Sequence, residues 1–319
     1  MSRVGLGRSA LRVSKLCFGG NVFGWTVDAA TSHRLLDGFV DAGFNFIDTA
    51  DVYSKWHDGN SGGESETIIG TWLRERGKRD QLVIATKVGS EMGPGEKGLS
   101  KAYIARAVEN SLRRLQTDYI DLYQSHWDDP ATPVEETLEA YASLIKAGKV
   151  RVIGASNFSP ERLTAALAAH AAQGLPRYEC LQPEYNLYER AGFEGALQDI
   201  CRRNELGVIT YFSLAGGFLT GKYRGAQDLG KSARGSDVGK YLDARGQRIL
   251  AALDEVAAQY RATPARVALA WLMAQPGVTA PIASATSASQ LAELIAAGNL
   301  TLEAAALQRL TEASAYPAG

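Results

Sequence analysis

The sequence alternates from end to end between short apolar runs and longer segments with helical spacing. The runs are rich in Val, Ile, Leu and aromatic residues and are too short for helices, which is typical of buried strands. Eight of them occur: KLCFGG (15–20), NFIDTA (45–50), LVIATKV (82–88), IDLYQSH (120–126), VRVIGAS (150–156), ECLQPEY (179–185), GVITYFS (207–213) and TAPIASA (279–285). Eight strand–helix units predict an α/β protein with a (β/α)8 TIM barrel. The alternative, an open doubly wound sheet, usually has fewer strands.

Capping signals indicate where the helices begin and end. Ser100 is a predicted N-cap, and the segment after it has one apolar face, formed by Ile104, Val108, Leu112 and Leu115. Three hydroxyl–proline pairs predict a cap followed by a helix that begins at the proline: Thr132–Pro133, Ser159–Pro160 and Thr263–Pro264. Gly148 and Gly207 are expected where helices end and the next strand begins.

Four segments lie outside the repeating pattern. Residues 2–14 are expected to form an N-terminal hairpin, and residues 302–314 an extra C-terminal helix. No compositional break divides the chain, so residues 1–319 are interpreted as one domain. Two loops are unusually long, 89–100 and 220–243. Such loops are often lids or ligand clamps, although a mobile surface insertion fits the composition of 220–243 equally well.

Charge and cysteine content restrict the function. The 34 Lys and Arg residues balance 35 Asp and Glu residues, whereas nucleic-acid grooves and anionic membranes require a basic excess. No apolar run is long enough to span a bilayer, and the first residues lack the apolar block of a signal peptide. The three cysteines are far apart and form no CxxC pair. We therefore expect a cytoplasmic protein with reduced thiols, which binds neither nucleic acid nor membrane.

Two glycine-rich motifs are misleading. GLGRSA (5–10) has dinucleotide-fingerprint spacing, but only four residues precede it and a strand-like segment follows, so we interpret it as a hairpin turn. GGFLTGKY (216–223) resembles a phosphate-binding loop but has Tyr223 where Ser or Thr should hold magnesium. Its glycines and Lys222 remain candidates for phosphate contacts. No serine-hydrolase elbow occurs, and the four histidines show no paired spacing, so no metal is expected.

Ionisable and polar residues follow the predicted strands. In a TIM barrel the site forms where the carboxyl ends of the strands meet. The residues at those ends, in chain order, are Asp48 with Tyr53, Lys87, His126, Ser156 with Asn157, Gln182 and Tyr211. Each has an ordinary structural interpretation, such as a helix cap or a solvated lysine. The combination at successive strand ends of one barrel favours a catalytic site.

The chain resembles the aldo-keto reductases over nearly its whole length. The matching blocks are GFNFIDTADVYS with GGESETIIG, VIATKVG, DLYQSHWDD, GKVRVIGASNFS, LQPEYNLYER and SLAGGFLTGKYR. The resemblance is strongest to the branch with bacterial sugar and general aldehyde reductases and potassium-channel beta subunits. It implies an Asp-Tyr-Lys-His catalytic tetrad, which Asp48, Tyr53, Lys87 and His126 fill.

These residue types suit carbonyl reduction, which delivers a hydride to carbon and a proton to oxygen. Tyr53 is the expected general acid, but a phenol with a pKa of ~10 holds its proton tightly. The ammonium of Lys87 is expected to lower that pKa, and Asp48 to keep Lys87 charged and in position. His126 is expected to donate a hydrogen bond to the carbonyl oxygen. No side chain supplies a hydride, so a cofactor is required.

The resemblance also implies a nicotinamide cofactor, with NADPH expected and NADH as the alternative. The cofactor-binding residues that it implies are Gly20, Asn21, Asp48, Ser156, Asn157, Gln182, Tyr211, Phe212, Ser213, Leu214, Gly217, Lys222, Arg234, Ser284, Thr286, Gln290 and Glu293. A helix is predicted to begin near Ser287, so its amides suit a phosphate. Many relatives have Arg in place of Thr286 and Asn in place of Leu294. We therefore expect Arg234 to supply the positive charge for the 2′-phosphate.

Aromatic residues are expected to line the substrate pocket. Trp25, Trp56 and Trp127 fall on loops at the mouth, where they would join Tyr53 and His126. The function expected is NADP(H)-dependent reduction of aldehydes or ketones, with sugar-like or aromatic carbonyls as possible substrates. A cofactor-sensing binding protein of the channel-beta-subunit type is the alternative. His126 argues against it, because the channel subunits have Asn there. The sequence leaves the physiological substrate, the reaction direction and the oligomeric state open.

Overall fold

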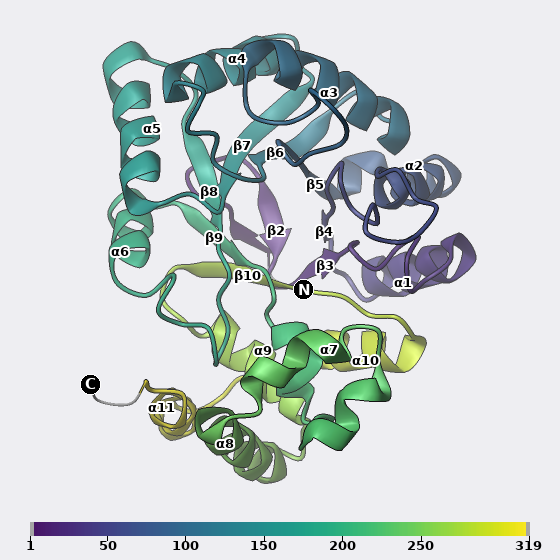
Figure 1. Ribbon diagram of the computed structural model, residues 1–319, viewed down its shortest axis with the longest axis vertical. Helices are drawn as coiled ribbons and strands as arrows, with labels where there is room; N and C mark the ends of the chain where they lie inside the picture. The colour runs from purple at the N-terminus through teal and green to yellow at the C-terminus, as the bar shows by residue number, and fades with distance from the viewer. Residues whose placement is uncertain (1–2, 317–319) are drawn as a thin grey trace.

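The computed structural model describes residues 3–316. Eight parallel strands form a closed barrel in the order β10-β3-β4-β5-β6-β7-β8-β9, and helices surround it (Figure 1). The strands are β3 (Cys17–Gly19), β4 (Phe46–Asp48), β5 (Val83–Val88), β6 (Ile120–Ser125), β7 (Val150–Ser156), β8 (Tyr178–Gln182), β9 (Gly207–Thr210) and β10 (Val278–Ala283). Each coincides with one of the eight predicted runs, although β8 and β10 begin one residue before theirs, so the predicted (β/α)8 barrel is confirmed.

The main helices are α1 (Ala29–Asp41), α2 (Glu64–Arg76), α3 (Lys101–Leu115), α4 (Val134–Lys146), α5 (Pro160–Gln173), α6 (Ala196–Arg203), α8 (Ala244–Tyr260), α9 (Pro264–Met273), α10 (Ala288–Ala297) and α11 (Ala304–Ala313). The predicted C-terminal helix is α11. Short helical turns connect other elements: η1 (Arg79–Gln81), η2 (Ala215–Thr220), η3 (Ala226–Lys231), α7 (Gly235–Val238) and η4 (Gly239–Tyr241).

Most predicted helix caps are confirmed. The hydroxyls of Ser100, Ser159, Thr263 and Ser287 each accept a hydrogen bond from a backbone N–H of the first turn that follows. The prediction for Thr132 is wrong by one residue. Helix α4 begins at Val134, and the Thr132 hydroxyl donates instead to Asp129 Oδ2 at 2.7 Å. The carboxylate thus holds the Thr132 hydroxyl away from the helix end.

The two glycines expected at helix ends differ. Gly148 follows the last residues of α4 with a φ of 73°, as predicted. Gly207 is the first residue of β9, as predicted, but α6 ends before it at Arg203, and the left-handed residue after that helix is Glu205. A Cβ at Gly207 would lie 2.6 Å from Leu6 Cδ1 and 2.9 Å from the Gly7 nitrogen. Glycine is therefore needed at Gly207 because the N-terminal hairpin packs against it.

The predicted hairpin closes the end of the barrel where the strands begin. Strands β1 (Arg3–Gly5) and β2 (Arg12–Ser14) pair antiparallel around the GLGRSA turn. In Figure 1, β2 is seen within the outline of the barrel. Leu6, Leu11 and Val13 are buried in a cluster with Phe46 and Leu122 of the barrel interior. The end where the strands begin is thus filled with apolar side chains, so a functional site is expected at the end where the strands finish.

The two long loops differ in structure. Residues 89–100 carry only an isolated bridge between Gly93 and Glu96. Residues 220–243 contain η3, α7 and η4, and they bury the side chains of Tyr223, Val238 and Tyr241. Residues 220–243 are therefore packed onto the protein through apolar contacts and are not a wholly exposed insertion. Between residues 3 and 316, no helix is long and apolar enough to cross a membrane.

Candidate active site

Three predicted tetrad residues meet inside the barrel, at the end where the strands finish. Lys87 Nζ donates to Asp48 Oδ2 at 2.6 Å and to the Tyr53 hydroxyl at 2.7 Å. A third hydrogen bond joins it to the Thr49 carbonyl at 2.9 Å. Asp48 ends β4 and Lys87 lies on β5, so the parallel register brings the two charges together. Three acceptors satisfy all three protons of the ammonium, which fixes its position.

Two glutamine amides hold the other oxygen of Asp48. Gln124 and Gln182 each donate through Nε2 to Asp48 Oδ1, at 3.1 and 3.0 Å, and Gln182 also donates to Gln124 Oε1. Gln124 was missed by the sequence analysis. A signal was present, since it precedes His126 by two residues and therefore points to the same side of β6. In the barrel Gln124 lies beside Lys87, as its register partner on the neighbouring strand.

Burial works against the ionised form of both Lys87 and Tyr53. For Lys87, Asp48 and the Tyr53 hydroxyl outweigh this effect, so its pKa is raised and the ammonium persists. For Tyr53, burial dominates and raises the pKa to about 12, while Lys87 lowers it in part. Lys87 lowers the pKa of Tyr53, as expected, but the effect of burial is larger, so the net pKa is above its usual value and not below it. The phenol is held in its protonated form at neutral pH, as a general acid requires.

His126 lies beside Tyr53 and is neutral. Burial, with the positive charge of Lys87 adding to it, lowers the pKa of His126 well below its usual value. Its Nδ1 atom is 3.0 Å from the hydroxyl of Ser90, a second residue that the sequence analysis missed. Ser90 is the second residue after β5, and nothing in the sequence marks it. When the hydroxyl donates to Nδ1, the Nε2 atom carries the proton and is available to a carbonyl oxygen.

The three tryptophans gather around the same phenol. The Trp25 and Trp56 rings meet edge to face at 5.8 Å, and Trp56 meets Tyr53 at 5.8 Å. On the other side, His126 is 6.0 Å from Tyr53 and stacks on Trp127 at 6.0 Å. Trp56 and Trp127 are about half exposed, at 50% and 52%. The mouth is therefore an aromatic wall with the Tyr53 hydroxyl at its base.

The comparisons with known proteins agree with this geometry. A family model described as "Aldo/keto reductase family" matches residues 15–315. The chain belongs to the aldo-keto reductase family. It is 36% identical to "Uncharacterized oxidoreductase YrpG" of Bacillus subtilis, covering 98% of this chain and 96% of that protein. It is 35% identical to "Probable voltage-gated potassium channel subunit beta" of Oryza sativa, covering 90% and 88%. It is also 33% identical to "L-glyceraldehyde 3-phosphate reductase" of Escherichia coli, covering 96% and 90%.

Four polar residues of this aldo-keto reductase form one chain of hydrogen bonds at the ends of β7, β8 and β9. The Tyr211 hydroxyl donates to Asn157 Oδ1 at 2.8 Å, and Asn157 Nδ2 donates to Ser156 Oγ at 3.1 Å. Ser156 Oγ donates in turn to the Gln182 carbonyl at 2.8 Å. Asn157 has a φ of 55°, which turns its amide toward its neighbours. The predicted nicotinamide contacts are thus adjacent and fixed in orientation.

Gly20 and Asn21 have separate roles in the reductase fold. A Cβ at Gly20 would lie 2.9 Å from Ser65 Oγ, so glycine is required there for contact with α2. Asn21 Oδ1 accepts a hydrogen bond from Ser284 Oγ at 2.6 Å. The structure therefore joins two predicted cofactor residues from the first and last barrel units, Asn21 and Ser284.

The segment after β9 has the backbone of an anion cradle. Phe212, Ala215, Gly216 and Gly217 all have positive φ, between 48° and 102°. The N–H groups of Ala215 and Gly217 donate to the Phe212 and Leu214 carbonyls, at 2.7 and 2.9 Å, so the other N–H groups of these turns are the candidates for anion contacts. A Cβ at Gly217 would lie 3.2 Å from Lys222 Nζ, so glycine keeps the ammonium close to this backbone. Ser213 and Leu214 lie between the same turns, and Ser213 is buried. The predicted phosphate-binding residues are thus brought together.

Arg234 lies at the catalytic end of this aldo-keto reductase. Its guanidinium carbon is 5.2 Å from the Trp25 ring centroid. Burial lowers the pKa of Arg234, while nearby Tyr53 and Asp237 act to raise it. No residue between 3 and 316 forms a hydrogen bond or ion pair with the guanidinium. It therefore presents an unpaired positive charge beside the aromatic mouth.

The residues predicted for the adenosine end surround the start of α10. Thr286 donates through its backbone N–H and its hydroxyl to Gln290 Oε1, at 2.8 and 3.1 Å. Glu293 is ion-paired with Arg266 at 2.6 Å. Leu294 is buried in the core, which agrees with an apolar residue at that position. Among residues 3–316, no cluster of three or more His, Cys, Asp or Glu side chains is arranged to hold a metal ion.

Proposed function

We propose that this aldo-keto reductase reduces aldehydes or ketones to alcohols with NADPH, and that Tyr53 is the general acid. The observation that carries the proposal is the 2.7 Å contact between Lys87 Nζ and the Tyr53 hydroxyl, with Asp48 fixing the lysine. A protonated phenol beside a permanent ammonium can give up its proton while the ammonium stabilises the phenolate that remains.

The substrate carbonyl would lie between Tyr53 and His126, below the tryptophan wall. Neutral His126 would donate from Nε2 to the carbonyl oxygen, which stabilises the negative charge that develops there. Trp25, Trp56 and Trp127 would pack on the substituents of the carbonyl and exclude water. Apolar rings also pack well on sugars, so aromatic and sugar-like carbonyls both suit this pocket. The Escherichia coli relative is named as a reductase of L-glyceraldehyde 3-phosphate, a small aldehyde, which supports the aldehyde class.

The residues at the mouth fit a nicotinamide dinucleotide. Asn157 and Gln182 would bind the carboxamide with Ser156, Tyr211 would stack on the ring, and the positive-φ backbone of 212–217 would bind the pyrophosphate with Lys222. The adenosine would be bound by Thr286, Gln290 and Glu293. Asn21 and Ser284 would contact the part of the dinucleotide between the nicotinamide and the adenosine. The cofactor supplies the hydride, since no side chain can.

The test is a turnover assay with purified protein and NADPH against a panel of aldehydes, ketones and sugars, followed by loss of nicotinamide absorbance. We expect turnover of at least one aldehyde, and its loss in Lys87→Met and His126→Asn. Absence of turnover with every member, in protein that binds NADPH, would remove the reductase proposal.

The second candidate is a protein that binds cofactor and reports its redox state to a partner. The relatives named as probable potassium-channel beta subunits support it, at 35% and 34% identity. The presence of His126 favours the enzyme. Turnover distinguishes the two, since a sensor binds NADPH without steady-state consumption. We propose a cytoplasmic location for either, because Cys17, Cys180 and Cys201 are free and buried.

A further inference from the structure

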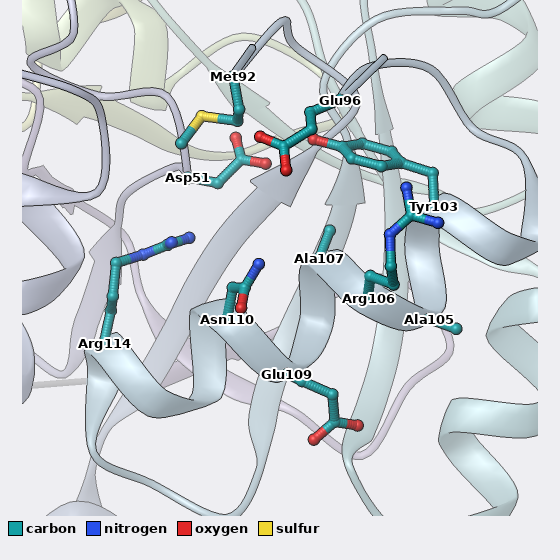
Figure 2. Close-up of a pocket in the computed structure, with 10 residues that line it drawn as sticks. All are labelled: Asp51, Met92, Glu96, Tyr103, Ala105, Arg106, Ala107, Glu109, Asn110 and Arg114. Atoms are coloured by element: carbon teal, nitrogen blue, oxygen red, sulfur yellow. The ribbon is translucent and has the colours of Figure 1, made fainter. Parts of the chain in front are cut away.

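A cavity of about 430 Å³ lies outside the barrel mouth, against the outer face of α3. Helix α3 supplies most of its wall, Met92 and Glu96 of the 89–100 loop cover it, and Asp51 closes the inner end. Figure 2 shows the side chains of Asp51, Arg114 and Asn110 directed toward the same central space, with Glu96 and Tyr103 opposite Asp51. None of these residues belongs to the tetrad or to the proposed cofactor site.

Asp51 is the unusual member of this cavity. It is 1% exposed, and neither carboxylate oxygen has a hydrogen-bond partner within the described chain. Burial, with the negative charge of Glu66 adding to it, raises the pKa of Asp51 well above its usual value, against the smaller opposing effects of Arg114, the neighbouring Val52 N–H and Lys87. A buried ionised carboxylate without partners is strongly unfavourable, so such a group either takes up a proton or is paired with a cation. A partner from outside the chain would meet this requirement.

The charge of the wall indicates the sign of that partner. Three carboxylates line the cavity, those of Asp51, Glu96 and Glu109, against the guanidiniums of Arg106 and Arg114. Glu109 is paired with Lys149 outside the cavity wall. Arg114 Nε is already paired with Glu66 Oε2 at 2.7 Å. Its stem passes so close to Gly63 that a Cβ there would clash with Arg114 Cδ. Ion pairing thus accounts for Glu109 and for the Nε atom of Arg114. This leaves Asp51 and Glu96 against Arg106, and the balance favours a cation in front of Asp51.

The remaining wall favours an organic cation over a metal ion. The described residues offer no cluster of three or more carboxylate, His or Cys ligands here. The Tyr103 ring and the Met92 thioether instead provide apolar and aromatic surface, which suits an alkyl chain and a cationic nitrogen. Gly62, with a φ of 95°, lets Met92 approach, since a Cβ there would lie 2.8 Å from Met92 Cε.

We propose that this cavity binds a small primary alkylammonium ion, with Asp51 as its counter-ion and Glu96 at the entrance. The nitrogen would lie at the inner end against Asp51, and the alkyl chain would run along Met92 and Tyr103. The proposal is independent of the reductase activity, because it uses neither Tyr53 nor the nicotinamide.

The test is isothermal titration of the full-length protein with n-butylammonium chloride at about pH 7.5, where the amine is charged. We expect saturable one-site binding, no comparable binding of the neutral analogue 1-butanol, and binding at least tenfold weaker in Asp51→Asn, which loses the charge-assisted contact. Asp58→Asn is the matched control. It removes one carboxylate from the same loop at an exposed position outside the cavity wall, and should bind like wild type.

Asn110→Lys keeps the proposal testable if Asp51→Asn does not fold. Asn110 is exposed on α3 and lines the cavity, so the new ammonium can reach Asp51 and should abolish n-butylammonium binding. The proposal is overturned by an absence of saturable binding to wild type, which would leave the cavity to water. Equal binding of 1-butanol, or unchanged binding in Asp51→Asn or Asn110→Lys, would overturn it as well.

Discussion

The ammonium nitrogen of Lys87 lies 2.7 Å from the hydroxyl oxygen of Tyr53, inside the barrel and out of contact with bulk water. The proximity stabilises the phenolate, whereas burial stabilises the neutral phenol, and burial is the larger effect. Tyr53 is therefore protonated at rest, and the cost of releasing the proton is reduced by a charge already in place. Asp48 keeps that charge present despite the burial of Lys87.

The first prediction concerns Tyr53→Phe. The substitution removes the proton donor and keeps the ring against Trp56, so carbonyl reduction should fall by ~10²–10⁴-fold. The dissociation constant for NADPH should stay within a few-fold, because the phenol is not among the proposed dinucleotide contacts. Steady-state rates and a fluorescence titration measure the two quantities. Near wild-type turnover would show that another group is the acid.

The second prediction is a flat pH profile for reduction near neutrality. The reaction needs protonated Tyr53, whose raised pKa keeps it protonated well into the alkaline range. Neutral His126 is the major form because its pKa is lowered well below the usual ~6.5. The kcat/KM for an aldehyde should therefore change little between about pH 6 and about pH 8.5. A rise or fall centred near pH 6.5 would show that His126 titrates normally.

The third prediction concerns Ser90→Ala, which removes the hydroxyl 3.0 Å from His126 Nδ1. The histidine then loses the contact that selects its tautomer, and kcat should fall roughly fivefold, equivalent to the ~1 kcal/mol of one neutral hydrogen bond. The KM for NADPH should not change. Ser90→Thr retains a hydroxyl and should restore much of the rate. An identical loss in both variants would indicate a packing defect instead.

The fourth prediction is that cofactor orders the 220–243 segment. Lys222 lies between η2 and η3, and Arg234 immediately precedes α7. Within residues 3–316 neither side chain has an ion-pair partner, and a bound pyrophosphate would connect them. Amide hydrogen exchange from Lys222 to Arg234 should slow when NADPH binds. The hairpin at 3–14 serves as an internal control, since it lies at the other end of the barrel. Unchanged exchange in Lys222–Arg234 would exclude a clamp.

The fold was predictable because the strands are buried and the helix starts carry caps. All eight strand runs were recognised, since parallel strands inside a barrel are continuously apolar. Thr132 was misplaced because a neighbouring carboxylate, Asp129, competes for its hydroxyl. Gly207 was expected at the start of a strand and is there, but the reason for glycine at this position was missed, because it is contact with a hairpin some 200 positions earlier in the chain, which local spacing does not show.

The site was predictable in its residues and less so in its energetics. Asp48, Lys87 and Tyr53 meet as expected because their positions at strand ends determine their neighbours. The net pKa of Tyr53 depends on how completely packing removes water, and composition does not report that. Ser90 and Asp51 were not identified because their roles arise from contacts with distant segments: a histidine 36 residues away for Ser90, and a cavity against α3 for Asp51.

The last prediction is that NADPH binds more tightly than NADH, but with modest discrimination. The two cofactors differ by one phosphate with nearly two negative charges. Thr286, expected beside it, offers a hydroxyl that already donates to Gln290. The N-terminal amides of α10 add a favourable but weak contribution. Neutral contacts of this kind discriminate less than an arginine, which forms charge-assisted pairs worth ~1.5–3 kcal/mol each.

Arg234→Ala identifies which phosphate its guanidinium serves. The sequence alone predicts a loss confined to NADPH, through the 2′-phosphate. The position over Trp25, within the electrostatic influence of Tyr53, favours the pyrophosphate that both cofactors share. We therefore expect the dissociation constants of NADPH and NADH to rise together, by roughly tenfold. Lys240→Ala is the control, since that ammonium on the same segment pairs with Glu189. A loss for NADPH alone would return Arg234 to the 2′-phosphate, and tighter binding of NADH by wild type would overturn the cofactor assignment while leaving the reductase proposal intact.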